Sequence, residues 1–389
     1  MLFAKLNDLS IGGKGSYGIA ASAVERKADL PTYLRITDIF NDGTLNLSEL
    51  KSVDAPNSDK YILKPNDIVF ARTGGSTGRN YFYDGSDGVF VYAGFLIKFS
   101  IDPEKVNPKY VKYYCRSKQY NDWVQSFNTG STRGNINAQT FGNMEIPLPE
   151  RKQQDYLVSI LEPIDEKIKN NKKVNDNLQQ QAFSVFDNLI ANAENSDCNV
   201  SDYAFLNPKR TLAKNQVARS IDMSQLSTSG AFPSGWEMKP FNGGMRFTNG
   251  DTLLARITPC LENGKTAFIN FLDDGEVAFG STEYIVLAPK NDTPPEMLYC
   301  LARYSSFVDY AVKNMNGSSG RQRVSAETVG QYRLPLFDKH SLVLFREVVS
   351  PMFLKMRYNS LENMRLAELR DALLPKLMSG EMDVSDIDL

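Results

Sequence analysis

The chain repeats its own sequence once, and a repeat of this length restricts the possible fold more than any other feature. The two copies are offset by about 188 residues, the separation of the similar segments that begin at Asn128 and Asn316. Four pairs of segments match in the same order: 33–39 with 217–223, 66–72 with 250–256, 128–140 with 316–328, and 146–148 with 334–336. Because solenoid repeats are usually only roughly 20 to 50 residues long, this repeat predicts a duplicated domain and a molecule with pseudo-twofold symmetry.

The composition is that of a globular protein. Of the 389 residues, 42% are hydrophobic and 23% are charged, which provides enough apolar sequence for two or three packed domains. No apolar run approaches the length of a membrane span, and the first residues lack a signal-peptide pattern, so we expect a cytoplasmic protein without a membrane partner. A net charge of −2 argues mildly against a nucleic-acid binder, and any DNA affinity has to come from local patches or from partners.

The residues that most enzyme active sites need are missing from the sequence. The one histidine, His340, lies at the predicted start of a long helix, and the four cysteines are far apart. We therefore expect no histidine catalysis, no metal site, no disulfide and four buried thiols. Gly264-Lys265-Thr266 resembles the end of a Walker A motif, but Pro259 replaces the first glycine that this motif requires. No hydrolase, amino-methyltransferase or dinucleotide motif is present, so any chemistry is expected in a partner.

Each copy is predicted to contain a mixed α and β segment that precedes a long helix. The expected strands are 34–39, 68–72, 89–92 and 95–99 in the first copy, and 252–256, 266–269 and 283–287 in the second. A helix is expected after each set of strands, at 108–123 and at 295 to about 310, where proline occupies the first turn. Both segments therefore belong to the α+β class.

The two long helices are predicted from heptad patterns, in which apolar residues recur at alternating steps of three and four. The expected seams are residues 157, 161, 164, 168, 171, 175, 178, 182, 185 and 189, and residues 342, 345, 349, 352, 356, 359, 363, 366, 370, 373 and 377. Each helix has about 38 residues, which corresponds to roughly 57 Å. We expect the two helices to pack as an antiparallel coiled coil whose length sets the distance between the globular segments.

Asparagines interrupt both seams at equivalent places. Asn171 and Asn175 lie near the middle of the first seam, and Asn359 and Asn363 lie near the middle of the second. In an antiparallel pair the four amides would meet in one layer and fix the register, because a shifted pairing would bury them without partners. In the alternative interpretation, these are solvated residues on ordinary amphipathic helices.

Polar residues in the repeated loops are candidates for contacts with DNA. Arginine can bind guanine edges or phosphates, hydroxyl groups can bind phosphates, and asparagine can read adenine. The candidates are Arg35, Arg72, Thr77, Arg79, Ser131, Thr132, Arg133, Asn135, Arg219, Arg256, Lys265, Ser319, Arg321 and Arg323. Alternatively, Arg72 and Arg256 are structural residues that close strand ends, paired with Asp67 and Asp251.

Two segments of the sequence resemble a known family. Ile146-Pro-Leu-Pro149-Glu-Arg-Lys-Gln153 with the following seam, and Leu369-Arg-Asp-Ala-Leu-Leu-Pro-Lys-Leu-Met-Ser-Gly-Glu381, are similar to the two central regions of Type I restriction-modification specificity subunits. The resemblance extends over the whole chain. It implies a first target-recognition domain at 1–149, a first spacer helix at 150–193, a second recognition domain at 194–337, a second spacer helix at 338–380 and a tail at 381–389.

The same resemblance implies a non-catalytic subunit with several partners. Each recognition domain would read one half of a bipartite site in double-stranded DNA, and the helices would set the spacer and dock two methyltransferase subunits. S-adenosylmethionine, ATP and Mg would be bound by the methyltransferase and the restriction or translocase subunits. Two other interpretations remain open: a coiled-coil scaffold that does not bind DNA, and a nuclease or methyltransferase that acts alone.

Overall fold

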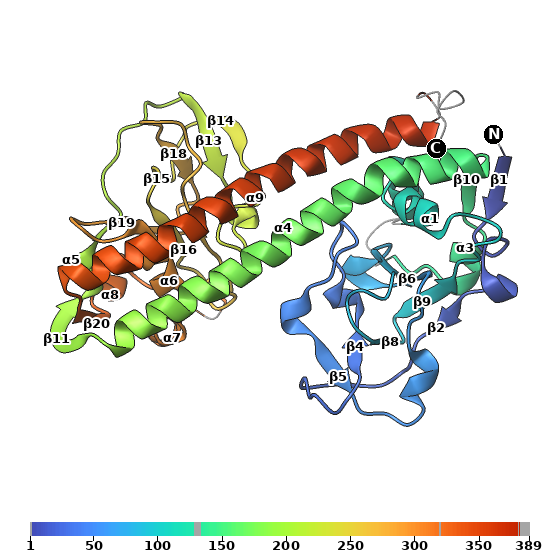
Figure 1. Cartoon of the computed structure of the whole chain (residues 1–389), viewed down its shortest axis with the longest axis horizontal. Coiled ribbons are helices and arrows are strands. Elements are labelled where there is room, and N and C mark those ends of the chain that lie inside the picture. Colours follow the sequence, from blue (N-terminus) through green and yellow to red (C-terminus); the bar gives the residue numbers. More distant parts are fainter. Residues whose placement is uncertain (1, 128–133, 319, 380, 382–389) are drawn as a thin grey trace. The chain divides into compact units, whose positions relative to one another are not determined.

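The computed structural model describes residues 2–127, 134–318, 320–379 and 381, and the chain divides into two compact units. The first unit comprises Met1–Ile164 with Leu369–Leu389, and the second comprises Asp165–Glu368. The long helices α4 (Arg151–Ala191) and α9 (Lys339–Ser379) each contribute residues to both units (Figure 1). No helix in the described part of the chain is both long enough and apolar enough to cross a membrane.

The strands of the first unit form three sheets. The central sheet has the order β2 (Ser16–Tyr17), β9 (Leu96–Ser100), β6 (Asp67–Ala71) and β7 (Asn80–Tyr83). The second has the order β3 (Ala23–Val24), β5 (Lys51–Val53), β4 (Thr32–Leu34) and β8 (Phe90–Tyr92), and a third pairs β1 (Leu2–Lys5) with β10 (Glu145–Leu148). The short helices are α1 (Pro108–Tyr114), α2 (Lys118–Gln125) and α3 (Ala138–Gly142).

The second unit is built in the same way. Its central sheet has the order β12 (Ala204–Leu206), β19 (Tyr284–Pro289), β16 (Thr252–Ala255) and β17 (Thr266–Phe268). The other sheets are β14 (Glu237–Pro240), β13 (Val217–Ile221), β18 (Ala278–Gly280) and β15 (Met245–Phe247), and β11 (Glu194–Asn199) with β20 (Arg333–Leu336). Its short helices are α5 (Val200–Tyr203), α6 (Pro295–Arg303), α7 (Ser305–Lys313) and α8 (Ala326–Gly330).

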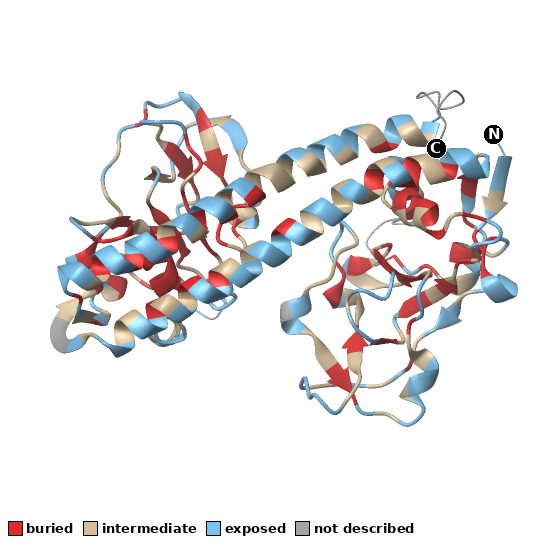
Figure 2. Ribbon diagram, in the orientation of Figure 1, coloured by how far each residue is buried: buried red, intermediate tan, exposed pale blue. Residues whose placement is uncertain are grey.

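The two units share the topology of the central sheet, of the two-stranded sheet and of three strands of the remaining sheet, which confirms the prediction of a duplicated α+β domain. The fourth strand of the remaining sheet differs, because β3 lies beside β5 in the first unit and β15 lies beside β18 in the second. In each central sheet the fully buried strand, β6 or β16, lies between a hairpin partner and a longer strand that follows later in the chain. Each second sheet contains one parallel pair, β4 with β8 and β13 with β18. Strands β6 and β16 are apolar on both faces because sheet and helices cover them, as Figure 2 shows for the buried residues inside each unit.

Several predicted elements end earlier than the sequence pattern suggested. The expected helix at 108–123 is two helices, because the Ser117 side chain accepts the N–H of Tyr120 and starts a new helix, and the helix expected from 295 breaks at Tyr304. The strand expected at 34–39 stops at Leu34, where Asp38 accepts the backbone N–H of Arg35 in a tight turn. The prediction of four buried thiols was wrong for two cysteines, since Cys198 and Cys260 are half-buried.

Within the second unit, α4 and α9 are antiparallel and hydrogen-bonded through the four asparagines. The Asn171 side-chain amide donates to Asn363 Oδ1 at 2.9 Å, and the Asn359 amide donates to Asn175 Oδ1 at 2.8 Å. Asn171 is 5% exposed and Asn359 is 2% exposed, so these two are not solvated. Asn171 also donates to Glu362 at 2.7 Å. The structure thus brings all four amides into one layer.

Beyond this layer the buried face of each helix departs from the expected heptad. Phe186 is buried where the heptad placed Val185, and Phe353 is buried where it placed Met352. The Phe353 ring packs edge-on against Phe268 at 5.3 Å. Here the helices cover the globular core of the second unit as well as each other, so the buried face follows both surfaces.

Each unit also buries one aspartate at the start of its central strand. Asp67 pairs with Lys98 at 3.1 Å, and Asp251 pairs with Arg210 at 2.5 Å. Each carboxylate also accepts the backbone N–H of the residue three positions earlier, at 2.8 Å. Burial raises the pKa of Asp251 to about 6, while the N–H of Thr248 and the Arg210 guanidinium act to lower it. The repeated position therefore keeps the aspartate but changes its cation.

Asn359→Leu is expected to lower the free energy of unfolding by about 1 to 3 kcal/mol, because Asn175 Oδ1 would lose its donor inside the helix pair. The double variant Asn175→Leu/Asn359→Leu should cost less than the sum of the two single variants. Urea unfolding of all four proteins gives the coupling energy. Strictly additive losses would contradict a direct amide pair.

Arg210→Ala is expected to destabilise the chain by about 3 kcal/mol at pH 7.5, because it leaves the buried Asp251 carboxylate without its cation. The pKa of Asp251 is raised in the folded state, so its carboxyl group takes up a proton as the pH falls through about 6. A neutral carboxyl group does not need the cation, and the loss should therefore shrink at pH 5. Urea unfolding at both pH values tests this, and an equal loss at both would contradict it.

Candidate nucleic-acid interface

Arg72 lies at the end of the central strand of the first unit, between two other segments. Its backbone N–H donates to the carbonyl of Phe95 at 3.1 Å, and its carbonyl accepts the N–H of Ile136 at 2.9 Å. The guanidinium carbon lies 5.1 Å from the centre of the Tyr17 ring. The Nε atom is buried and donates no hydrogen bond. Three chain segments therefore hold this cation in place at the strand end.

Arg256 occupies the equivalent place in the second unit. Its N–H donates to the carbonyl of Glu283 at 3.0 Å, and its carbonyl accepts the N–H of Val324 at 3.0 Å. The Nε atom is again buried without a partner. The Arg256 charge helps to lower the pKa of Glu283, after the larger effect of Arg323. In the described parts of both units, neither guanidinium donates a hydrogen bond to the protein.

The proposed pairing of these arginines with the nearby aspartates was wrong. Asp67 and Asp251 are occupied by Lys98 and Arg210 instead. These aspartates lie at the opposite ends of β6 and β16 from the two arginines, and a strand of four or five residues separates the charges.

The residues beside the two arginines differ between the units. The backbone contacts make Phe95 equivalent to Glu283, and Asn135 equivalent to Arg323. In the first unit Phe95 is 60% exposed, and Asn135 is also exposed. In the second unit Arg323 donates from Nε and Nη2 to Glu283, at 3.0 and 2.7 Å, and this pairing lowers the pKa of Glu283 and raises that of Arg323.

Other predicted DNA contacts are engaged within their own unit. Arg79 donates to the carbonyl of Ile39 at 3.0 Å, and Lys265 donates to the carbonyl of Met223 at 2.8 Å, so the two cations do the same structural work. The Thr77 hydroxyl lies within hydrogen-bond distance of two main-chain carbonyls, that of Gly74 in its own turn at 2.8 Å and that of Gly134 at 2.9 Å.

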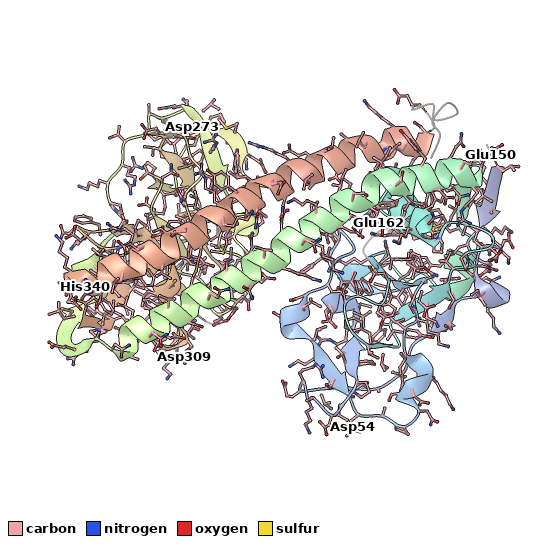
Figure 3. The ribbon with its side chains drawn as sticks, viewed as in Figure 1. Asp54, Glu150, Glu162, Asp273, Asp309 and His340 are labelled. Carbon is pink, nitrogen blue, oxygen red and sulfur yellow. The ribbon has the colours of Figure 1, made fainter. Side chains whose placement is uncertain are left out.

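Arg35 and Arg219 are held by carboxylates. Arg35 pairs with Asp38 at 2.5 Å. Arg219 pairs with Glu276 and with Asp273, which Figure 3 labels, and its guanidinium lies over the ring of Trp236 at 5.2 Å. Their charges are therefore partly neutralised before any ligand is bound.

The remaining candidates lie in or beside the two repeated loops. Ser131, Thr132, Arg133 and Ser319 lie outside the described residues. Arg321 is exposed, and its carbonyl accepts a hydrogen bond from Arg323 at 3.0 Å. Tyr17, Phe95 and Glu283 were not predicted as site residues. Phe95 and Glu283 each begin a predicted strand, and only their equivalent backbone contacts with Arg72 and Arg256 single them out.

The described residues provide no group that suggests metal chemistry. No cluster of three or more histidine, cysteine, aspartate or glutamate side chains lies within reach of one ion in the described ranges. His340 is exposed at the first turn of α9, where Figure 3 labels it. Burial raises the pKa of both buried thiols, Cys115 and Cys300, which keeps them protonated.

Comparisons with known proteins find similarity to one family. The model of the Type I restriction modification DNA specificity domain matches residues 14–180. The chain is 22% identical to the HindI specificity subunit of Haemophilus influenzae, over 94% of this chain and 98% of the relative. It is 21% identical to the MjaIX specificity subunit of Methanocaldococcus jannaschii, over 74% and 72%.

A solved structure shares the fold. The crystal structure of the Type I restriction-modification S subunit from M. genitalium has a TM-score of 0.55 and 17% identity, and the match covers 97% of this chain and 95% of that one. The repeated units and the antiparallel helices that the sequence predicted are thus part of a known architecture. The chain is therefore similar to Type I restriction-modification specificity subunits in sequence over most of its length, and to one of them in fold.

Proposed function

We propose that the chain is the non-catalytic subunit that selects the DNA sequence on which a Type I restriction-modification complex acts. Each unit binds one half of a bipartite site in double-stranded DNA. The observation that carries this proposal is the repeated strand-end arginine, whose backbone makes the same contacts in both units and whose guanidinium donates no hydrogen bond to the residues that the structure describes. A fixed guanidinium of this kind suits the phosphates and base edges of DNA.

The helices α4 and α9 act as the spacer between the two half-sites. Each has 41 residues, or about 60 Å at 1.5 Å per residue, and each contributes to both units. The amide layer of α4 and α9 fixes the register of the two helices within the second unit. We propose that the length of the two helices selects the number of unspecified base pairs.

Methylation and cleavage are assigned to partners. Two methyltransferase subunits would bind S-adenosylmethionine and extrude the target base, and restriction or translocase subunits would use ATP and Mg. This division of labour agrees with the absence of a metal cluster among the described residues and of nucleotide motifs in the sequence.

An apolar stripe on α9 supports docking of a helical partner. Leu344, Val348, Pro351 and Tyr358 recur at spacings of four, three and seven, so they lie along one side of the helix. Val348 is 46% exposed and Tyr358 is 57% exposed, whereas the opposite seam of α9 is buried. A second heptad stripe on a helix that already has one partner is typical of a helix in a larger bundle. We propose that a methyltransferase helix covers it.

The purified chain is expected to transfer no methyl groups to DNA, because its sequence contains no amino-methyltransferase motif. Together with its methyltransferase partner it should protect a bipartite site from nuclease digestion, in a salt-dependent manner. Footprinting and methyl-transfer assays on the chain, the partner and the complex test this. Robust methyl transfer by the chain alone, or no DNA binding by the complex at low salt, would contradict the proposal.

Val348→Asp combined with Tyr358→Asp is expected to weaken binding of the methyltransferase partner by roughly tenfold or more per residue, since each apolar contact contributes about 1.5 to 3 kcal/mol when buried. Co-purification and titration calorimetry measure the loss. Val217→Asp is the matched control, because this residue of β13 is 57% exposed in the same unit but lies outside the stripe. Equal effects of control and double variant would exclude docking on this stripe.

A further inference from the structure

The strand-end arginine is the same in both units, whereas the side chains beside it differ. This difference bears on how DNA is read. Arg72 and Arg256 follow equivalent strands and make equivalent backbone contacts. Beside them, Phe95 and Asn135 in the first unit correspond to the Glu283–Arg323 ion pair in the second. The scaffold is therefore held constant while the chemistry of one adjacent pair of positions changes completely.

The unchanged arginines suit a ligand that is the same in every DNA. Each guanidinium is half-buried, its Nε is enclosed, and within the described residues it has no anionic partner that accepts a hydrogen bond from it. A partly desolvated cation gains most from an anion with several acceptor oxygens. Phosphate has this chemistry and carries no sequence information, so both units can bind it with the same residue.

The exchanged positions suit a ligand that differs between the two half-sites. Asn135 is exposed and its amide can bond the N6 and N7 edge of adenine, and the exposed Phe95 ring can contact a thymine methyl group. Arg323 presents a guanidinium that Glu283 holds in one orientation, and its remaining N–H groups match the O6 and N7 acceptors of guanine. An amide with an aromatic ring cannot read the same bases as this ion pair.

We infer that Arg72 and Arg256 are sequence-independent phosphate contacts, and that the pairs Phe95–Asn135 and Glu283–Arg323 determine which base pair each unit prefers. The inference rests on the proposed function, because it assumes that both units bind DNA. It assigns an A·T preference to the first unit and a G·C preference to the second, each at one position of its half-site.

The experiment selects bound sequences from a random duplex pool with the full chain and its methyltransferase partner. The exchanged variants are Glu283→Phe/Arg323→Asn in the second unit and Phe95→Glu/Asn135→Arg in the first. Glu283→Phe/Arg323→Asn should replace a G·C preference by an A·T preference at one position of one half-site, and leave the other half-site unchanged. The exchange in the first unit should do the reverse in the other half-site, so each variant is the control for the other.

The arginines are tested in the same complex by affinity and by its salt dependence. Arg72→Ala and Arg256→Ala should each weaken binding to all selected sequences by roughly tenfold or more, and lower the slope of log affinity against log salt by about one. Arg72→Lys and Arg256→Lys should retain most of the affinity with unchanged base preference. Lys60→Ala, which removes an exposed charge from the first unit, is the control for net charge.

The results separate this inference from the proposed function. If the unaltered complex binds no DNA, the proposed function fails. If it binds a bipartite site but the exchanged pairs leave both half-site preferences unchanged, the inference fails and the proposed function stands. The inference also fails if Arg72→Lys or Arg256→Lys changes the preferred bases, or if Lys60→Ala has the effect of Arg72→Ala. Thermal unfolding of every variant near that of the unaltered chain shows that the losses are not due to misfolding.

Discussion

The hydrogen bonds between the asparagines of α4 and α9 are the constraint on which the helix pairing depends. The bonds from Asn171 to Asn363 and from Asn359 to Asn175 connect residues four apart on each helix, so both form in one register. A shift by one heptad in one direction would place the buried Asn171 opposite Met356 and the buried Asn359 opposite Ile168, and both amides would lose their polar partners. Apolar contacts alone would tolerate such a shift far better, because one heptad resembles the next. The amide hydrogen bonds therefore give the two helices one defined register, which apolar contacts alone would not.

Duplication explains why the two globular units share the same arrangement of residues around the central strand. Each unit needs a covered central strand, a buried aspartate at its start and a cation at its end. Asp67 and Asp251 are kept, but their partners come from different places in the chain, Lys98 from β9 and Arg210 from the segment after β12. Such exchange is tolerated because a buried carboxylate needs a cation in reach, not a particular residue. Conserving the scaffold in this way leaves the surface residues at its edge free to change.

Much of this architecture could be predicted from the sequence, because it depends on patterns. The repeat predicted two α+β units, the heptads predicted two long helices, and the placement of the asparagines predicted that they would meet. The breaks at Ser117 and Tyr304 could not be predicted from apolar spacing, since α1 and α2 continue one pattern across a cap made by a side-chain hydroxyl. Likewise the buried positions Phe186 and Phe353 depend on the globular core and not on the helix partner.

The site was harder to predict, because the residue type does not show which group in the folded chain a charged side chain will pair with. The sequence marks Arg35, Arg72, Arg79 and Arg219 as equal candidates. The structure separates them: Arg35 and Arg219 are paired with carboxylates, Arg79 is bonded to a carbonyl, and Arg72 lies against the Tyr17 ring. Phe95 would not be listed by any search for polar contacts. It becomes a candidate only when its backbone contact with Arg72 is compared with that of Glu283 and Arg256.

The near-neutral charge of the chain fits a subunit whose task is discrimination. Non-specific DNA affinity comes almost wholly from the number of phosphates that free cations neutralise. The chain has a net charge of −2, and Arg35, Arg219 and Arg323 are already paired to carboxylates. The chain itself therefore contributes little to non-specific DNA affinity. Under the proposed function, the two strand-end arginines set the register on the DNA backbone, while contacts with base edges contribute the difference in affinity between sites. A more basic surface would bind every DNA sequence more tightly. It would therefore reduce the ratio of specific to non-specific affinity, on which a restriction system depends.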